Sequence, residues 1–215
     1  MQNPQQIKKL DQDGRRLRSL ASQNIIVDAM MNLIQSGILE PTAQQVADEA
    51  SLGIRTVFRQ AQDKETLFSK MDEKVRATYE KKIKNTKPTG NIAKRIKDLI
   101  ELEADIFDAN LQFYRATMAN KWKYRLLQKN YERNQNHMKG LLYKWLPEIN
   151  DLKENVQILL TSMNSAGYWV ELRENQMLSK QEAMELKISI LEAVSYTHLR
   201  AHETLRYLVC RLLLE

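Results

Sequence analysis

The chain has 215 residues, a formal net charge of +6 at pH 7, and 43% hydrophobic and 28% charged residues, which is ordinary for a soluble globular protein of one or two domains. Six Gly and four Pro are few enough to favour a mostly helical fold, and the mildly basic charge permits a nucleic-acid partner without requiring one. Neither a membrane-spanning run nor a signal peptide is present, and the single Cys210 excludes an internal disulfide framework, so we expect a cytoplasmic protein with no membrane partner.

The first clear element is the amphipathic segment SQNIIVDAMMNLIQSG. Its apolar residues follow the i, i+3, i+4, i+7 spacing of a helix: Ile26, Ala29, Met30 and Leu33. Gly37 is suited to end this helix, because glycine tolerates the left-handed conformation beyond a helix C-terminus. A new helix is predicted after Thr42, which can form a capping box with Gln45.

A short break and a third helix follow. The second helix has a small apolar edge, and Ser51-Leu52-Gly53 separates it from an equally regular segment. One predicted side of the third helix is apolar: Ile54, Val57, Phe58 and Ala61. The other side is polar: Arg55, Thr56, Arg59 and Gln60. Two short helices joined by a tight turn indicate a helix-turn-helix whose polar side reads base edges. A solvated helical hairpin fits the same pattern.

The run IIVDAMMNLIQSGILEPTAQQVADEASLGIRTVFRQAQDKETLF resembles the TetR/AcrR family of bacterial transcriptional regulators. The resemblance covers residues 18–70. It implies that Thr42 and Lys64 contact backbone phosphate, and that the recognition helix presents Arg55, Thr56, Phe58, Arg59 and Gln60 to DNA. Phe58 stands where the family commonly has a phosphate-binding Tyr, so that hydroxyl contact is absent. Ser51 replaces the usual turn Gly, Gly53 the usual capping Ser or Thr, and Ala61 a large aromatic residue.

The resemblance also implies the domain organisation. Residues 1–17 would form a basic N-terminal arm, 18–68 a three-helix helix-turn-helix domain, and 69–193 a larger helical effector-binding and dimerisation domain. Basic residues precede the first predicted helix: Lys8, Lys9, Arg15, Arg16 and Arg18. In the family such an arm can reach DNA, but a frayed, solvated terminus is an equal alternative.

The remainder reads as further helices. A fourth, capped by Asp63, runs from Lys64 to about Ile83 and ends at the linker KNTKPTG. The following helices are predicted at about 91–109, 111–120, 122–146, 151–176 and 179–193, with a capping box at Ser179 and Glu182. By analogy with the family, the last two helices of each subunit would join in a four-helix bundle, giving a homodimer on a near-palindromic operator in double-stranded DNA.

The apolar stripes on those helices serve equally well as intramolecular core. Large, soft side chains suit an apolar or aromatic small-molecule effector: Phe107, Phe113, Tyr114, Met118, Trp122, Met163, Tyr168 and Trp169. For each of these residues, a place in the core is the competing interpretation.

The tail VSYTHLRAHETLRYLVCRLLLE, residues 194–215, has the spacing of a helix, yet it is similar to something other than a protein. VSYTHLRAHET matches the translation of a transposon-based sequencing adapter, and LVCRLLLE matches a flow-cell adapter. We therefore expect this tail to be adapter read-through joined to a truncated gene. On this hypothesis Cys210, His198 and His202 have no function, and genomic sequencing across the Ala193 codon tests it.

The sequence shows no paired metal ligands, no glycine-rich phosphate loop and no nucleophile motif, so we predict no enzyme, no catalytic residue, no metal and no cofactor. The leading hypothesis is a sequence-specific DNA-binding transcriptional regulator, most often a repressor in this family, released by a small effector. The alternative is a helical protein-interaction module whose degenerate helix-turn-helix no longer binds DNA.

Overall fold

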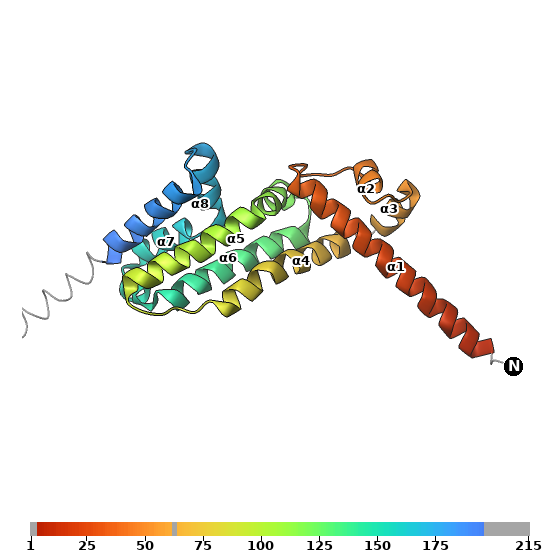
Figure 1. Cartoon of the computed structure of the whole chain (residues 1–215), viewed down its shortest axis with the longest axis horizontal. Coiled ribbons are helices and arrows are strands. Elements are labelled where there is room, and N and C mark those ends of the chain that lie inside the picture. The colour runs from red at the N-terminus through yellow and green to blue at the C-terminus, as the bar shows by residue number, and fades with distance from the viewer. Residues whose placement is uncertain (1–3, 62–63, 196–215) are drawn as a thin grey trace, which may run out of the picture. The chain divides into compact units, whose positions relative to one another are not determined.

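The computed structural model describes residues 4–61 and 64–195, and within this range all regular secondary structure is helical (Figure 1). The predicted all-α fold class is confirmed. The main helices are α1 (Pro4–Gln35), α2 (Ala43–Glu49), α3 (Ile54–Ala61), α4 (Lys64–Asn85), α5 (Ile92–Asn120), α6 (Arg125–Trp145), α7 (Glu154–Met163) and α8 (Ala166–Val170). A 3₁₀ turn, η1 (Pro147–Asp151), follows α6, and a π-helical turn, η2 (Glu171–Asn175), follows α8. A last helix covers residues 180–195 of the described range.

The chain divides into two compact units. Unit 1 comprises Met1–Thr78 and Gln112–Tyr131, and unit 2 comprises Tyr79–Leu111 and Glu132–Glu215. Three helices, α4, α5 and α6, therefore each supply residues to both units. Unit 1 includes the N-terminal region singled out by the sequence, but it also includes the segment from Gln112 to Tyr131, which the sequence had grouped with the later helices.

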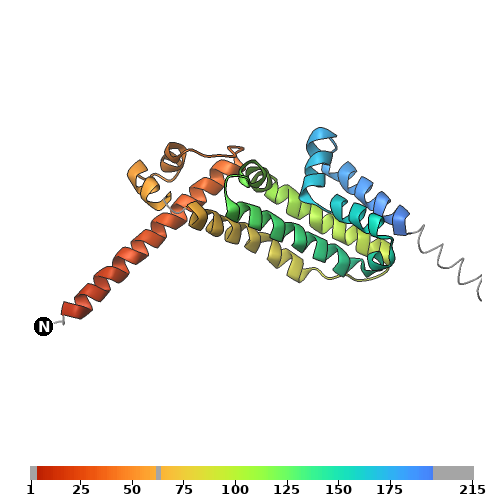
Figure 2. The same ribbon diagram turned by 180° about the vertical axis from the view of Figure 1, so that it is seen from behind.

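Unit 1 is built around α1, with α2 and α3 packed against it (Figures 1 and 2). The buried residues of its core include Ile26, Val27, Ala29, Ile34, Val46, Ala47, Val57, Leu67, Met71 and Ala116. These residues come from five helices, and they include Ile26 and Ala29 of the predicted α1 stripe, whereas Met30 and Leu33 of that stripe are partly buried against the cluster. Burial of such side chains is the main stabilising contribution in a helical domain of this kind.

Two predicted helix ends are confirmed in detail. Gly37 adopts φ +100°, and the backbone N–H groups of Gly37 and Ile38 donate to the carbonyl oxygens of Ile34 and Leu33 at 3.0 Å each, which closes α1 in a Schellman motif. At the last helix, the Ser179 N–H donates to the Glu182 carboxylate at 2.8 Å and the Glu182 N–H donates to the Ser179 hydroxyl at 3.2 Å. This is the predicted capping box.

Unit 2 has its own apolar core. Its largest fully buried side chains include Trp145, Trp169, Ile96, Leu99 and Leu142. Its portions of α5 and α6 lie side by side in both ribbon views (Figures 1 and 2). Tyr79–Leu111 and the residues after Glu132 therefore form a second packed helical body with a core of its own.

Two predicted helix boundaries after residue 90 are wrong. The break expected between 109 and 111 is absent: α5 is continuous from Ile92 to Asn120, and the Asn110 side-chain amide donates to the Ile106 carbonyl at 2.7 Å within it. The single helix expected over 151–176 is instead divided at Asn164 and Ser165. There the Asn164 amide donates to the Met138 carbonyl of α6 at 3.2 Å, and the Ser165 hydroxyl accepts from the Tyr168 N–H at 3.1 Å and caps α8.

The two ends of the chain also bear on the predictions. α1 begins at Pro4, so the residues expected to form a basic arm are continuous with the first helix. The predicted tail, 194–215, lies outside the described residues except for Val194 and Ser195, which belong to the last helix.

Candidate nucleic-acid interface

The entry to the helix-turn-helix is fixed by the predicted capping box at Thr42. The Thr42 hydroxyl accepts from the Gln45 N–H at 3.3 Å, and the Gln45 side-chain oxygen accepts from the Thr42 N–H at 2.9 Å. Val46 and Ala47 bury the inner side of α2. The hydroxyl of Thr42 thus organises the start of α2, while its side chain remains exposed.

The turn between α2 and α3 uses a serine where a left-handed residue is required. Ser51 adopts φ +51°, and the N–H groups of Ser51 and Leu52 donate to Asp48 and Ala47 at 3.2 and 3.0 Å, as in a Schellman motif. Gly53 then opens α3, since its carbonyl accepts from the Thr56 N–H at 2.8 Å. A Cβ added at Gly53 would meet nothing within 4 Å, so glycine is not sterically required there.

The helix α3, predicted to be the recognition helix, has one buried and one exposed side. Val57 is 2% exposed and Ile54 is half-buried, as predicted for the inner side. Phe58, also predicted on that apolar stripe, is 57% exposed, so this part of the prediction is wrong. Positions 55, 58 and 59 lie on one helical face because of their i, i+3, i+4 spacing. Arg55 and Arg59 are exposed there, as Phe58 is.

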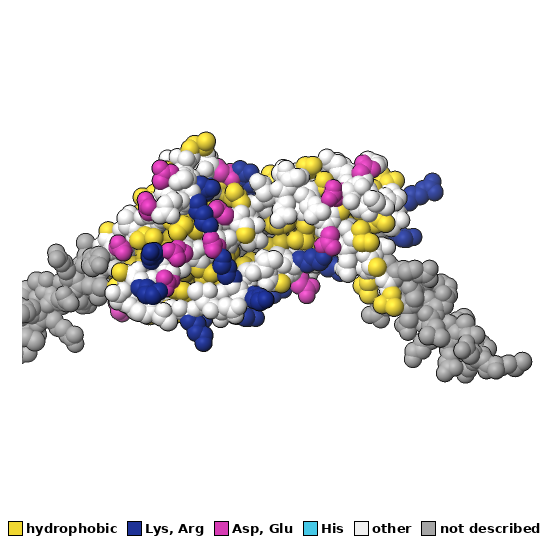
Figure 3. Space-filling view, viewed as in Figure 1, with side chains coloured by type: hydrophobic (Ala, Val, Ile, Leu, Met, Phe, Trp, Pro, Cys, Tyr) yellow, Lys and Arg dark blue, Asp and Glu magenta, His cyan; other side chains and the backbone are white. Residues whose placement is uncertain are grey.

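The exposed side of α3 is therefore an aromatic ring flanked by two guanidinium groups: Arg55, Phe58 and Arg59. We call this the α3 face. Basic side chains project from the surface where α3 lies (Figure 3). Thr56 is half-buried beside the α3 face. The periodicity alone assigned Phe58 to the apolar side, because a stripe with i+3, i+4 spacing does not say how wide the buried side of a short helix is, whereas the family resemblance placed it among the DNA-facing residues.

Several predicted contacts concern side chains outside the described part. Gln60 belongs to α3 and Lys64 begins α4, but their side chains are outside it, and Asp63 is wholly outside it. The same holds for the side chains of the basic residues before the first predicted helix, Lys8, Lys9, Arg15, Arg16 and Arg18.

Polar contacts connect the helices that support α3. The Asn32 amide of α1 donates to the Glu49 carboxylate of α2 at 2.9 Å, and the Lys70 ammonium of α4 donates to the Gln23 side-chain oxygen at 2.8 Å. Lys74 also forms an ion pair with Asp28. These contacts are mostly exposed and contribute little individually, so the buried apolar core carries most of the stability of this scaffold.

The eight residues predicted for an effector pocket do not all belong to one unit. Phe113, Tyr114, Met118 and Trp122 belong to unit 1, whereas Phe107, Met163, Tyr168 and Trp169 belong to unit 2. In unit 2, the rings of Phe107 and Trp169 are 6.2 Å apart, and Trp169 is fully buried with its indole N–H donating to Asp108 at 2.7 Å.

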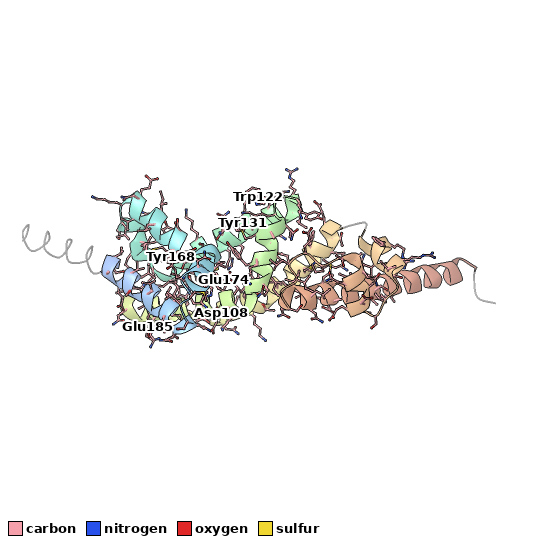
Figure 4. All side chains as sticks on the ribbon, turned by 90° about the horizontal axis from the view of Figure 1, so that it is seen from above. Asp108, Trp122, Tyr131, Tyr168, Glu174 and Glu185 are labelled. Carbon is pink, nitrogen blue, oxygen red and sulfur yellow. The ribbon has the colours of Figure 1, made fainter. Side chains whose placement is uncertain are left out.

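Within unit 1, Trp122 lies in the connection between α5 and α6 and is 80% exposed (Figure 4). The Lys121 ammonium lies 4.7 Å from the Trp122 ring centroid and 3.8 Å from that of Tyr131. Burial and the neighbouring Tyr131 raise the pKa of Tyr114 to about 12, so this phenol is neutral at physiological pH.

A cavity of about 410 Å³ lies within unit 1, and of the eight predicted residues only Phe113 lines it. Its walls come from α1 to α6 and include Val57 and Phe58 of α3. The sequence does not reveal this cavity, because its lining residues lie on the same apolar stripes that a fully packed core would use.

The described residues hold neither a cluster of metal ligands nor a membrane-spanning helix. Over 4–61 and 64–195, no group of three His, Cys, Asp or Glu side chains is placed to hold a metal ion. Within the same ranges, no helix has the length and apolar character needed to cross a membrane.

Comparison with known proteins gives one informative match. No protein-family model and no curated protein sequence matches the chain. Among solved structures, the chain is similar to a Clostridium perfringens protein provisionally described as a fatty acid metabolism regulator, with a TM-score of 0.53 and 17% sequence identity. The match covers 78% of this chain and 97% of that one. At this identity, the likeness shows that the two proteins share a helical fold.

Proposed function

We propose that the chain is a sequence-specific DNA-binding transcriptional regulator that acts as a homodimer, a repressor released by a small effector. The observation that carries this proposal is the α3 face: a short helix after a tight turn, anchored by buried Val57, with two guanidinium groups exposed. A helix of this size fits the major groove of B-DNA, and the preceding helix would brace it.

The chemistry of the α3 face suits base edges. An arginine can donate two hydrogen bonds to the O6 and N7 atoms of guanine, and an exposed phenyl ring can pack against a thymine methyl group. Arg55 and Arg59 would supply the first kind of contact and Phe58 the second. Gln60 and Thr56 would add base or phosphate contacts, and Thr42 and Lys64 phosphate contacts, as the family resemblance implies.

A homodimer is supported by apolar side chains exposed on unit 2. Ile158 and Leu159 of α7 are 59% and 52% exposed, and Leu186 of the last helix is 37% exposed. We propose that these side chains become buried between two subunits. Twofold symmetry would then present two recognition helices to half-sites ~34–36 Å apart on a near-palindromic operator. Sedimentation of the Leu159→Glu variant, compared with wild type, tests this arrangement, and an unchanged dimer would contradict it.

The fold comparison supports the same proposal, since the similar solved structure is described as a regulator of fatty acid metabolism. Its description names no operator and no effector, and its lipid-related role is not carried over to this chain.

DNA binding is tested by fluorescence anisotropy with the intergenic DNA next to the gene. Arg55→Ala and Arg59→Ala should each weaken specific binding by about 1–3 kcal/mol and relax the preference at one base position. Lys64→Ala should weaken binding to all sequences alike and reduce the salt dependence. Lys97→Ala, which removes an exposed basic residue of unit 2, is the matched control. Equal affinity of all four variants would refute the assignment of the α3 face.

A helical protein-interaction module remains the second candidate. It is favoured by one observation, the 57% exposure of Phe58 on the α3 face, because exposed aromatic residues often anchor protein interfaces. The same titrations separate the two candidates. A folded dimer with no salt-sensitive affinity for any duplex would favour the interaction module.

A further inference from the structure

The cavity in unit 1 is a partly open pocket, and its volume is large for a small helical domain. Protein interiors are close-packed, and voids that exceed a water molecule are few. At about 410 Å³, the cavity instead falls within the range of ~300–1,000 Å³ that is usual for small-molecule sites. All residues that line it belong to unit 1, so its walls are set by the same packing that places the helix-turn-helix.

The walls of the cavity are mostly apolar and include side chains that adapt their shape. Met30 of α1 and Met71 of α4 line it, together with the aromatic rings of Phe68 and Phe113. Methionine is flexible and polarisable, so it accommodates irregular ligands. These walls fit the body of an apolar or aromatic molecule.

One amide side chain lies in the cavity wall. Asn130 of α6 lines the cavity and is 8% exposed. An asparagine side chain carries both a hydrogen-bond acceptor and a donor group. Asn130 therefore offers a hydrogen-bonding point to a molecule that occupies the cavity.

The two carboxylates of the lining, Glu40 and Asp72, make the cavity unfavourable for acids. The Glu40 carboxylate accepts from Lys123 at 2.8 and 2.9 Å, and the Thr117 hydroxyl donates to the Phe113 carbonyl at 2.9 Å. Asp72 also lines the cavity and is paired with Arg76 at 3.6 Å. Among the described residues of the lining there is no lysine or arginine, so a carboxylate or phosphate would enter without a counter-charge.

The cavity reaches the recognition helix directly. Consecutive residues of α3, Val57 and Phe58, both contribute to its lining. Val57 is the buried anchor of α3, whereas Phe58 belongs to the exposed α3 face. A molecule in the cavity would therefore contact the residue that anchors α3 and a residue of the surface proposed to meet DNA.

We propose that this cavity binds a small uncharged molecule with an apolar or aromatic body and one hydrogen-bonding end, and that its occupancy changes the placement of α3. Ligand binding in the cavity does not depend on the DNA-binding proposal. Regulation of DNA binding through a shift of α3, in contrast, rests on the proposed function. The ligand acts inside the DNA-binding unit itself, at the inner side of the recognition helix.

The site is tested on the full chain with two dyes that share one ring system. N-phenyl-1-naphthylamine is neutral and fluoresces in apolar surroundings, and 8-anilinonaphthalene-1-sulfonate adds a negative charge to the same rings. The neutral dye should bind saturably, one per chain, and the sulfonate at least tenfold more weakly. Equal affinity for the two dyes, or no saturable binding of the neutral one, would overturn the proposal.

Two alanines of α5 give a matched pair of variants. Ala116 lines the cavity and Ala119, three residues later, is exposed. Ala116→Leu should weaken binding of the neutral dye at least tenfold, and Ala119→Leu should leave it unchanged. If Ala116→Leu does not fold, methyl NMR of the wild-type chain decides. The dye should then shift Met30 and Met71, and shifts confined to Met163 and Met177 of unit 2 would refute the site.

The regulatory step is tested by repeating the DNA titrations with saturating neutral dye. DNA affinity should change severalfold in wild type and in Ala119→Leu, but not in Ala116→Leu. Because linkage is reciprocal, DNA should change the dye affinity by the same factor. Strong DNA binding that is indifferent to the dye overturns the regulatory step. Absence of DNA binding would instead refute the proposed function and leave the dye-binding result to decide the site.

Discussion

The buried ion pair between Lys187 and Glu103 gives a test of how the last helix is held in unit 2. The two side chains are 2% and 0% exposed, and the Lys187 ammonium donates to the Glu103 carboxylate at 2.9 Å. The ammonium also lies 5.5 Å from the Phe107 ring and 6.0 Å from the Trp169 ring. Lys187→Met would keep much of the side-chain volume and remove the charge, which leaves a carboxylate buried without its partner.

The expected cost follows from that burial. Removing one partner of a buried pair destabilises a protein by about 3–5 kcal/mol, whereas replacing both by apolar residues is often neutral or stabilising. Lys187→Met should therefore lower the urea midpoint by on the order of 1–3 M, and adding Glu103→Leu should restore most of the loss. A double variant as unstable as Lys187→Met would refute the argument, because the loss would then come from packing and not from charge.

The pH dependence provides a second readout of the same pair. Burial raises the pKa of Glu103 above its ordinary value, and Lys187 and Asn164 oppose this rise only in part. A carboxyl group whose pKa is raised by folding contributes stability below its unfolded pKa and loses it as the pH rises through the folded pKa. Without Lys187, the loss of stability caused by ionising Glu103 should be larger. The free energy of unfolding of Lys187→Met should therefore increase by up to about 1.4 kcal/mol per pH unit as the pH is lowered from 8 towards 5. The double variant should lack this slope, and a pH-independent stability of Lys187→Met would contradict the prediction.

Three further predictions concern other parts of the molecule. Ser51→Gly combined with Gly53→Ser should raise the melting temperature by about 2–4 °C in calorimetry. Glycine removes the strain of the left-handed backbone at position 51, and serine at position 53 can cap α3. A melting temperature below that of wild type would contradict the turn geometry. Phe58→Tyr should strengthen binding to all duplexes by about 1 kcal/mol, because the added hydroxyl can reach a phosphate. Fluorescence anisotropy measures the affinity, and an unchanged affinity would contradict the prediction. Hydrogen bonds from Lys180 and Lys82 lower the pKa of Asp105, so the ionised carboxylate stabilises the fold. This stabilisation should be present at pH 7 and vanish as the pH falls below about 4. It is measured as the difference in the free energy of unfolding in urea between wild type and Asp105→Asn.

Sequence reasoning was most accurate where one residue type has one dominant local role. Thr42 with Gln45, Gly37 and Ser179 with Glu182 each satisfy backbone groups at a helix end, and each was found where the sequence predicted it. Such signals are local, because the donor and acceptor lie within three to five residues of each other.

Sequence reasoning failed where a side chain has two possible roles that only the folded chain decides. Asn110 hydrogen-bonds one turn back and continues its helix, whereas Asn164 bonds to a different helix and ends its own. Phe58 was assigned to the apolar side by its spacing, but in the folded chain Val57 is buried and Phe58 is 57% exposed. The division of the chain into its two compact units depends on contacts distant in sequence, which periodicity does not encode.

The cavity itself predicts an unusual response to a larger core residue. Adding methylene groups to a well-packed interior costs about 1–3 kcal/mol, because neighbouring side chains must move. Ala183 of unit 2 is fully buried and does not line the cavity of unit 1, so Ala183→Leu should pay that cost. Ala116 is also buried, at 7% exposed, but it lines a cavity of about 410 Å³, so the added carbons of Ala116→Leu can enter existing space.

Each methylene group buried there should contribute up to about 0.8 kcal/mol, and Ala116→Leu should be neutral or stabilising while Ala183→Leu is clearly destabilised. Thermal and urea unfolding of the two variants distinguish these outcomes in the absence of any ligand. Equal destabilisation would mean that the walls around Ala116 are already packed in solution, and the inference of a ligand site behind α3 would then fail. A stabilised Ala116→Leu would instead show that the space is real, and its DNA affinity would report how α3 responds when that space is filled.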